Sequence, residues 1–440
     1  MLAKTVQRGC VVSAMLLGSL FYAQEYSQLH LEDAIQLGLK QNNSLQIQSS
    51  KSTLSKLVEK DLKNEKLPEV DFKTSFHVLS NINQYEDGFL HPSTSYKTPR
   101  IKYNFTLGAE IPVYWGGKLK LDEEKAVIES EVEELKYKKE SREVRMQIIT
   151  AYLKVLHLQE QQQLLQSKMK EDSIVIAQTE KLQKNGVVTF NEVLRTRLQL
   201  SNHTMAFSEL QTEIEILEHG VKTLLSIPEE TEVHLFTKDL FTDTSSLGLV
   251  DQMVHQAYEN SEVLKVSEKK IEAGKIDKKL VKSSAMPKIS AGAEYGFSYP
   301  NMLFFPPQEH LYRVGAVGVN VTIPISNWYK NKVKNQIAEE KINASTLELK
   351  AKQEEIQHDV FAASARLDEA NSKIKIAEEA IEQAKENYRI VKLKYTNKLS
   401  LITELIDADN ALLEAQSKLI SLQIDKQLKY YQLQYILGNL

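Results

Sequence analysis

Four segments of the chain alternate between apolar and polar residues, the period of two expected of a β-strand whose faces differ. They lie at about 69–79, 100–114, 287–299 and 312–325. In the second segment, Phe105 and Leu107 alternate with Asn104 and Thr106. Alternation over about ten residues suits a transmembrane strand, with apolar side chains toward lipid and polar side chains toward a lumen. It also suits a half-buried strand of a soluble sandwich, and the pattern alone favours this alternative because the signal of one transmembrane strand is weak.

Long stretches between these segments contain no helix breaker. Residues 118–185 and 330–395 have neither proline nor glycine, so each is expected to form a helix of roughly 100 Å. Two shorter helices are expected at about 187–226 and 250–285, with lengths of roughly 60 Å and 54 Å that together match one long helix. These matching lengths suggest a cylinder whose wall alternates long helices with pairs of shorter helices stacked end to end.

The chain is a tandem repeat. When the sequence is aligned with itself, the segment that starts at Leu29 superposes on the segment that starts at Gly248. Beyond the first pair of strands the alignment shifts, because the loop of the first copy is longer, and Asn185 then superposes on Asn397. We therefore divide the chain into a first repeat at 24–227, a connector at 228–249 and a second repeat at 250–440.

The N-terminus has the features of a signal peptide. Lys4 and Arg8 precede an apolar stretch from Cys10 to Ala23, which is too short for a membrane-spanning helix and has the length of a signal-peptide core. We expect residues 1–23 to be removed after Ala23, and an N-terminal anchor helix is the alternative. Cys10 is the only cysteine, so the mature chain would have no disulfide and no thiolate metal site.

Composition and charge argue against two classes of function. The net charge of -4 argues against a nucleic-acid partner, because phosphate binding needs a basic surface. The 10 histidines are scattered, and no phosphate-binding loop, nucleophile elbow or H-E-x-x-H motif occurs, so nothing indicates a catalytic or metal site. We expect no enzymatic activity, no catalytic residue, no metal and no cofactor.

Both tryptophans, Trp115 and Trp328, follow the second strand segment of a repeat, in PVYWGGK and PISNWYKNK. An indole ring with its polar N–H suits the boundary between membrane and water. Two core tryptophans are the alternative. Their matching place in both copies, one residue out of register, favours the membrane interface.

Four strands cannot close a barrel, and in lipid each open edge would leave backbone N–H and C=O groups unpaired. Two chains would supply eight strands and three would supply twelve, and a barrel of about eight strands is filled by its own side chains. The polar strand positions, such as Lys73, Glu110 and Glu294, would face a wet lumen. A homotrimer embedded in outer-membrane lipid is therefore the expected assembly.

The order of these elements resembles the outer membrane efflux protein family of TolC-like channels. The motifs that support the resemblance are L-x-x-A-I-x-x-x-L-x-x-N (Leu31 to Asn42), P-x-x-x-G-G-K (Pro112 to Lys118), N-G-V-V-T-F-N-E-V-L-x-x-R (Asn185 to Arg197) and L-x-x-I-L-G (Leu433 to Gly438). The resemblance implies a mainly α-helical, trimeric TolC-like protein. Its transmembrane β-barrel, with four strands per protomer, would continue into long periplasmic helical hairpins. It also implies a periplasmic adaptor (membrane fusion) protein and an inner-membrane transporter as partners.

The resemblance further places the pore constriction at the periplasmic tips of the hairpins. The tip turns would contain Asn185, Gly186, Asn397 and Lys398, and the constriction would contain Glu404, Asp407 and, with a smaller effect, Glu192. At Lys398 and Ser400 the sequence departs from the glycine and arginine common in the family. The alternative for the acidic residues is a purely structural role, because acids at a helix start are favoured by the helix dipole.

The function implied is the exit duct of a tripartite system that exports small molecules. A duct for type I protein secretion is the alternative, because the transporter selects the substrate. A structural periplasmic coiled-coil protein is a remote alternative, which would have no use for the duplicated pairs of amphipathic strands.

Overall fold

The structure, a computed structural model, describes residues 29–228, 230–231, 233, 235 and 249–440. The expected signal peptide and most of the expected connector lie outside these residues. The described residues form two compact units, and each unit draws on both halves of the sequence. Unit 1 comprises the described residues of Met1–Ile47, Lys138–Ser261 and Gln353–Leu440, and unit 2 comprises Gln48–Tyr137 and Glu262–Lys352.

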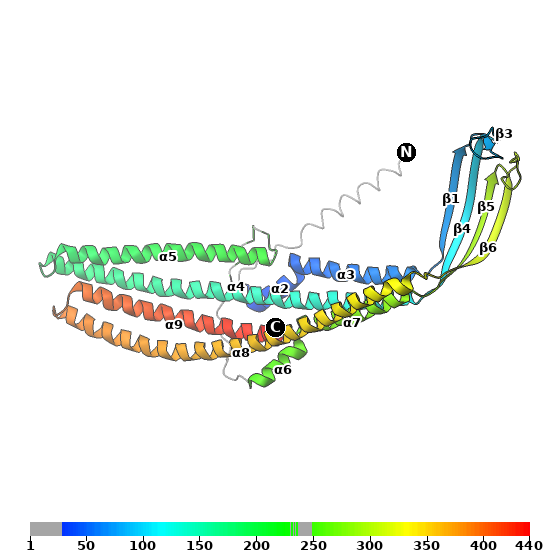
Figure 1. Cartoon of the computed structure of the whole chain (residues 1–440). Coiled ribbons are helices and arrows are strands. Elements are labelled where there is room, and N and C mark those ends of the chain that lie inside the picture. Colours follow the sequence, from blue (N-terminus) through cyan, green and yellow to red (C-terminus); the bar gives the residue numbers. More distant parts are fainter. Residues whose placement is uncertain (1–28, 229, 232, 234, 236–248) are drawn as a thin grey trace, which may run out of the picture. The chain divides into compact units, whose positions relative to one another are not determined.

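Unit 2 contains an antiparallel sheet of four strands in the order β1-β4-β5-β6 (Figure 1). The strands are β1 (Glu69–Val78), β4 (Ile101–Trp115), β5 (Lys288–Tyr299) and β6 (Tyr312–Thr322). Their ends lie within three residues of the segments expected from alternation. A separate small hairpin, β2 (Ile82–Gln84) with β3 (Thr94–Tyr96), lies between β1 and β4 and was not predicted.

The strand register gives the sheet one apolar and one polar face. Phe105 lies directly opposite Phe297, so apolar side chains of neighbouring strands meet on one side. This apolar face is uncovered, and Val317 on it is 88% exposed. The opposite face contains Glu69, Asp71, Lys73, Glu110, Glu294 and Asn320. The alternation in the sequence therefore predicted the two faces correctly, because successive side chains of a strand point to opposite sides.

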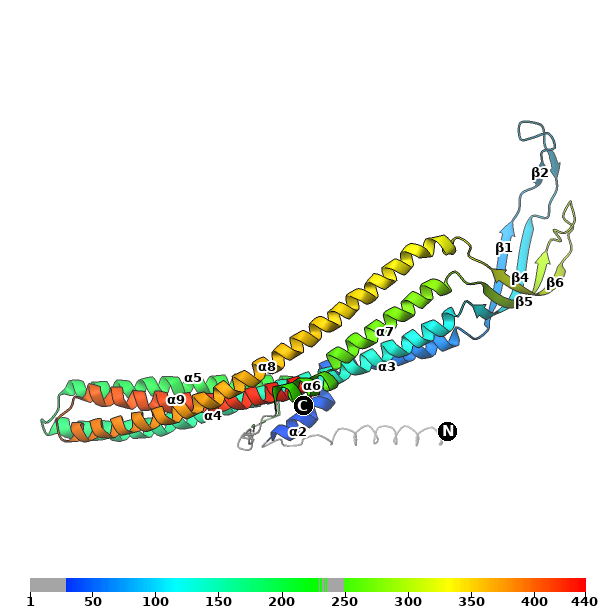
Figure 2. The same cartoon turned by 60° about the horizontal axis from the view of Figure 1, so that its bottom comes forward.

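The helices follow the tandem repeat. They are α2 (Leu31–Gln41), α3 (Asn43–Asn64), α4 (Lys118–Lys184), α5 (Phe190–Leu224), α6 (Val250–Asn260), α7 (Glu262–Ser283), α8 (Asn327–Thr396) and α9 (Ile402–Leu437). In unit 1, α4 with α5 and α8 with α9 form two helical hairpins that lie side by side (Figure 1; Figure 2). Among the described residues, no helix combines the length and the apolar composition that crossing a membrane requires.

The single helix expected at 250–285 was wrong, because the structure breaks it into α6 and α7 at Ser261. The first repeat contains the same break at Asn42, the position that superposes on Ser261 when the two copies are aligned. Neither break contains the proline or glycine that sequence analysis uses to end a helix.

Side-chain amides fix both breaks. The Asn42 amide donates to the Leu224 carbonyl at 2.9 Å, and its oxygen accepts the N–H of Ser44 at 2.9 Å. In the second repeat, the Asn260 amide donates to the Leu437 carbonyl at 3.0 Å. Each amide thus satisfies a carbonyl at the end of α5 or α9 that has no partner within its own helix.

Each hairpin packs its base against one short helix through an apolar cluster. The cluster of the first repeat includes Ala34, Ile148, Tyr152, Val155, Val221 and Leu225, and that of the second includes Ala257, Val360, Leu367, Leu433 and Leu437. The Tyr152 hydroxyl is also buried and donates to the Leu29 carbonyl at 3.0 Å. The two clusters anchor the hairpins at the end far from their turns.

Replacing Asn42 with alanine would remove its three side-chain hydrogen bonds at the first break, to the Leu224 carbonyl and from the N–H groups of Ser44 and Leu45. We expect the free energy of unfolding to fall by about 1–3 kcal/mol, measured by thermal or denaturant unfolding of the protein in detergent. Asn43→Ala is the matched control, because the neighbouring Asn43 is exposed and its loss should cost less than about 0.5 kcal/mol. Equal effects of the two substitutions would contradict the role given to Asn42.

Candidate functional site: the hairpin tips and a buried polar layer

The turn between α4 and α5 ends the first helix with a left-handed residue. Gly186 has a φ of 68°, and its N–H donates to the Gln183 carbonyl at 2.9 Å. The next N–H, of Val187, donates to the Leu182 carbonyl at 2.9 Å. Glycine adopts this conformation without steric cost, which is why it commonly follows a helix end.

The turn between α8 and α9 has the same geometry without the glycine. Lys398, the counterpart of Gly186 in the second repeat, has a φ of 63°. The N–H of Leu399 donates to the Lys394 carbonyl at 2.8 Å, and the Asn397 amide donates to the Leu393 carbonyl at 2.9 Å. A side chain at positive φ is strained by roughly 1–2 kcal/mol, so the second turn is the more strained of the two.

Glu404 and Asp407 lie in the first turns of α9, three residues apart and both exposed. The opposite side of this helix is buried through Ile402 and Leu405. The Glu404 carboxylate accepts a hydrogen bond from the Ser400 hydroxyl, four residues earlier in the turn. One chain thus presents the two acids on a common exposed face, and their place at a pore constriction stays a prediction.

Glu192 has different surroundings from the other two acids. It is half-buried, and its carboxylate accepts the Thr189 N–H at 3.4 Å at the start of α5. It also accepts the Tyr395 hydroxyl at 3.4 Å. Burial and the Glu192 charge raise the pKa of Tyr395, against a lowering by Thr179, so the hydroxyl stays protonated and donates. Glu192 therefore links the first hairpin to α8.

The structure brings the two tryptophans to the same short segment of unit 2. Trp115, the last residue of β4, lies opposite Lys288, whose ammonium is 5.9 Å from the indole ring. Trp328, in the first turn of α8, donates its indole N–H to the Ala285 carbonyl at 3.2 Å. Both rings therefore lie at the end of the sheet where the helices begin, which is the place a membrane interface requires. That role remains a prediction.

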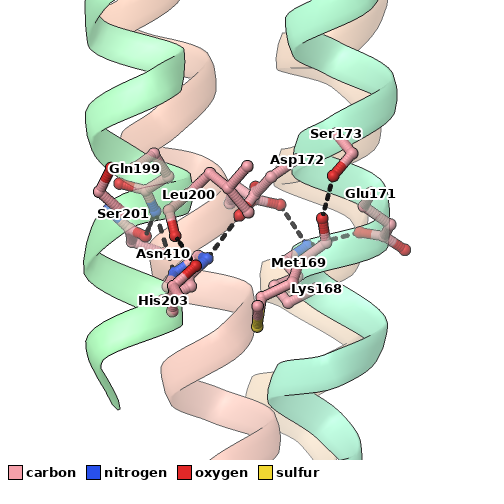
Figure 3. Close-up of polar contacts among 12 residues, drawn as sticks. Lys168, Met169, Glu171, Asp172, Ser173, Gln199, Leu200, Ser201, His203 and Asn410 are labelled. Carbon is pink, nitrogen blue, oxygen red and sulfur yellow. Dashed lines mark hydrogen bonds and ion pairs between the residues drawn. The ribbon is translucent and has the colours of Figure 1, made fainter. Parts of the chain in front are cut away.

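Unit 1 contains a buried polar layer that was not predicted from the sequence (Figure 3). We define this polar layer as Lys168 and Asp172 of α4, His203 of α5 and Asp409 of α9. Lys168 is only 5% exposed, and its ammonium lies between two carboxylates, Asp409 and Glu171, the latter at 2.8 Å. Such a layer is unusual inside a helical bundle, because a buried charge is costly unless it is paired.

The charges of Lys168 and its carboxylates stabilise one another. Burial alone would lower the pKa of Lys168, but its hydrogen bonds to Asp409 and Glu171 outweigh burial and raise it. Burial raises the pKa of Asp409, against the lowering by Lys168. The two directions oppose each other, and we favour the charged pair, because the ammonium has a carboxylate on either side.

His203 forms the other half of the polar layer. Its Nδ1 lies 2.6 Å from an Asp172 carboxylate oxygen, and since that oxygen only accepts, Nδ1 carries the hydrogen. The Gln199 amide is 3.2 Å from the other ring nitrogen and also bonds to Asn410 of α9. His203 is thereby connected to α4 and, through Gln199, to α9.

Three of the four members of the polar layer lie in the first repeat and have no polar counterpart in the second. In the second repeat, the counterparts of Lys168, Asp172 and His203 are alanines, namely Ala380, Ala384 and Ala415. Comparing the two copies position by position therefore gives the signal that would have revealed the layer from sequence. The first hairpin therefore makes a buried charged contact to α9, through Lys168 and Asp409, where the second repeat has an alanine in place of the lysine.

Comparisons with known proteins agree on the fold. A model of the outer membrane efflux protein family matches residues 63–225 and 253–439, which is most of the chain. The outer-membrane channel OprN has 17% sequence identity over 93% of this chain and 90% of that chain, at a TM-score of 0.77. CusC has 15% identity over 96% and 95% of the two chains, at a TM-score of 0.76.

The open-state structure of the MtrE outer membrane channel of Neisseria gonorrhoeae has 18% identity over 93% of this chain and 88% of that chain, at a TM-score of 0.72. At such identities the structures show a shared fold. They confirm the predicted class, mainly helical with a small sheet and built from a tandem repeat. No curated protein sequence matches the chain.

The strained turn at Lys398 can be tested directly. Lys398→Gly should raise the free energy of unfolding by about 1 kcal/mol, since glycine adopts positive φ without strain. The reciprocal change, Gly186→Lys, should lower stability by a similar amount, because it introduces the same strain in the first turn. Thermal unfolding of both variants in detergent provides the measurement. A destabilised Lys398→Gly variant would show that Lys398 makes contacts worth more than the strain.

Proposed function

Because the chain belongs to the outer membrane efflux protein family, we propose that it is the outer-membrane channel of a tripartite efflux system. In this proposal it passes small molecules from a periplasmic adaptor and an inner-membrane pump to the cell exterior. The observation that supports it most directly is the four-stranded sheet, which has an uncovered apolar face, a polar face and two open edges.

In this proposal the four-stranded sheet forms one third of a closed barrel. Its outer strands, β1 and β6, run in opposite directions because each of the three pairings between them is antiparallel. The β6 edge of one copy therefore matches the β1 edge of another in an antiparallel ladder. Three copies supply about twelve strands, enough for an open lumen. Closure in this way places the apolar face toward lipid and the polar face toward the lumen.

The helical unit supports the same assembly. Apolar side chains at helical spacing are exposed along α5, namely Phe190, Leu194, Leu198 and Met205. An exposed apolar row of this length on a single chain indicates a protein partner. In the proposed trimer, this partner is a second copy of the chain.

In the assembled trimer, the hairpin tips form the periplasmic entrance. Glu404 and Asp407 from three copies then converge, and rings of carboxylates in a narrow pore attract cations. Glu192, bonded to Tyr395, contributes to this entrance by linking neighbouring helices.

The alternative functions differ in what passes through the same architecture. A type I protein secretion duct would need the same barrel and hairpins as a small-molecule efflux channel. Because the inner-membrane transporter selects the substrate, identifying the transporter that co-purifies with the chain distinguishes these two functions. Among the described residues, no group of three or more His, Cys, Asp or Glu side chains is arranged to bind a metal.

Insertion of the sheet into a membrane can be tested on its two faces. Val319→Arg places a charge on the apolar face and should cost about 2–4 kcal/mol near the bilayer midplane, so the trimer should disappear from outer-membrane fractions. Asn320→Arg is the matched control, because the neighbouring residue lies on the polar face. Heat-modifiable trimers on gels measure both variants, and Phe105→Arg repeats the test on β4. Normal trimer amounts for the apolar-face variants would favour a soluble sandwich.

The acidic entrance is tested by the double substitution of Glu404 and Asp407 with alanine. We expect the ratio of cation to anion permeability in planar bilayers to fall toward one and block by multivalent cations to weaken, since the variant lacks the carboxylate rings. Glu192→Ala should have a smaller effect on selectivity. Unchanged selectivity with a lower melting temperature would instead assign the two acids to the helix start.

A further inference from the structure

In unit 2, the helices α3, α4, α7 and α8 contribute segments that lie side by side in that order (Figure 2). The polar contacts that join each helix to the next include Gln48–Glu133 at 2.9 Å, Lys125–Asp277 at 2.7 Å and Lys278–Glu339 at 3.3 Å. All four helices, including the two at the ends of the row, line one groove with a volume of about 830 Å³. The row is therefore curved, and the groove lies on its concave side.

The groove has an apolar floor. Small and branched apolar residues from all four helices form it, namely Leu54, Val58, Ala126, Ile128, Val132, Ala273, Gly274 and Ala344. Leu54 is 60% exposed, so this floor is open to a molecule that enters the groove. Sites for small molecules commonly have volumes of roughly 300–1,000 Å³, a mainly apolar lining and a few polar groups. The groove has the size and the lining of such a site.

Positive charge predominates around this floor. Six lysines line the groove, against four acidic residues. Three of the six lysines form ion pairs. Lys125 pairs with Asp277 at 2.7 Å and Lys136 pairs with Glu133 at 2.6 Å. Lys269 pairs with Glu131 and Glu272, which do not line the groove.

The other three lysines lie on three different helices. They are Lys51 of α3, Lys270 of α7 and Lys341 of α8, and all three are exposed. Among the described residues, none of the three forms an ion pair. A lysine can cover apolar surface with its methylene stem while its ammonium stays in water. An anion in the groove would therefore meet unpaired positive charge from three helices and apolar surface beneath it.

We propose that this groove binds amphipathic anions, small molecules with an apolar body and one acidic group such as a sulfonate or a carboxylate. The apolar body lies on the floor at Ile128 and Val132, and the ammonium groups of Lys51, Lys270 and Lys341 attract the acidic group. A cation with the same apolar body is disfavoured, because like charges repel. That such anions are exported molecules in transit rests on the proposed function, whereas binding in the groove does not.

Isothermal titration calorimetry of the full chain in a neutral detergent tests the groove, after subtraction of titrations into detergent alone. The probe is naphthalene-2-sulfonate, and naphthalene-2-methylammonium is the cation with the same ring. We expect the sulfonate to bind at least tenfold more tightly than the ammonium. Replacing Lys51, Lys270 and Lys341 together with glutamine should weaken sulfonate binding about eightfold, since one exposed ion pair contributes roughly twofold in affinity.

A second triple variant is the matched control. Lys60, Lys275 and Lys350 lie on the same three helices and are exposed, but they do not line the groove. Replacing them with glutamine removes the same charge and should leave sulfonate binding within twofold of the wild type. Ala344→Glu adds a negative charge at an exposed position inside the groove, where folding should tolerate it, and should also weaken sulfonate binding several-fold.

Equal affinities of the two triple variants for the sulfonate would overturn the proposal, because the loss would then follow total charge and not the groove. Equal affinities of the wild type for the sulfonate and the ammonium would also overturn it. A chain that binds the sulfonate as expected but conducts no ions in planar bilayers would support the groove and reject the channel function.

Discussion

The unpaired backbone groups along β1 and β6 are the constraint on which the rest of the structure depends. In water, the uncovered apolar face of the sheet would be exposed. In lipid, its two open edges would leave backbone N–H and C=O groups without hydrogen-bond partners. In the proposed oligomer, pairing between copies would remove both problems at once and create a lumen lined by the polar strand positions. The oligomer therefore follows from backbone chemistry before any side chain at the hairpin tips is considered.

The tandem repeat explains how one chain supplies matching pieces of such a wall. Each repeat contributes two strands of the four-stranded sheet, one long helix and three shorter helices, and the helix breaks at Asn42 and Ser261 are equivalent. Departures from the repeat are therefore informative. The turn residue is Gly186 in one copy and Lys398 in the other, and the buried charges of α4 correspond to alanines in α8. These differences let two similar hairpins have different stabilities within one assembly.

The features predicted correctly from the sequence, such as the strands, are determined by residues that are adjacent in the sequence. The alternation of Asn104, Phe105 and Thr106 sets the faces of a strand locally, so the strands and their two faces were identified correctly. The break at Asn42 depends on the carbonyl of a residue 182 positions away, and the pairing of Lys168 depends on a residue 241 positions away. No local pattern contains such contacts, and a charged residue in a long helix is most simply assigned to its solvated face.

The polar layer and the hairpin tips impose opposite requirements on the same helices. If the hairpin tips form a channel entrance, as proposed, its opening must separate contacts between the hairpins. A layer of paired charges adds little net stability over apolar packing but fixes the arrangement while it is intact. Three of the four members of the layer belong to the first repeat, so its ion pair lies where the first hairpin meets α9, and the apolar clusters at the hairpin bases do not include it.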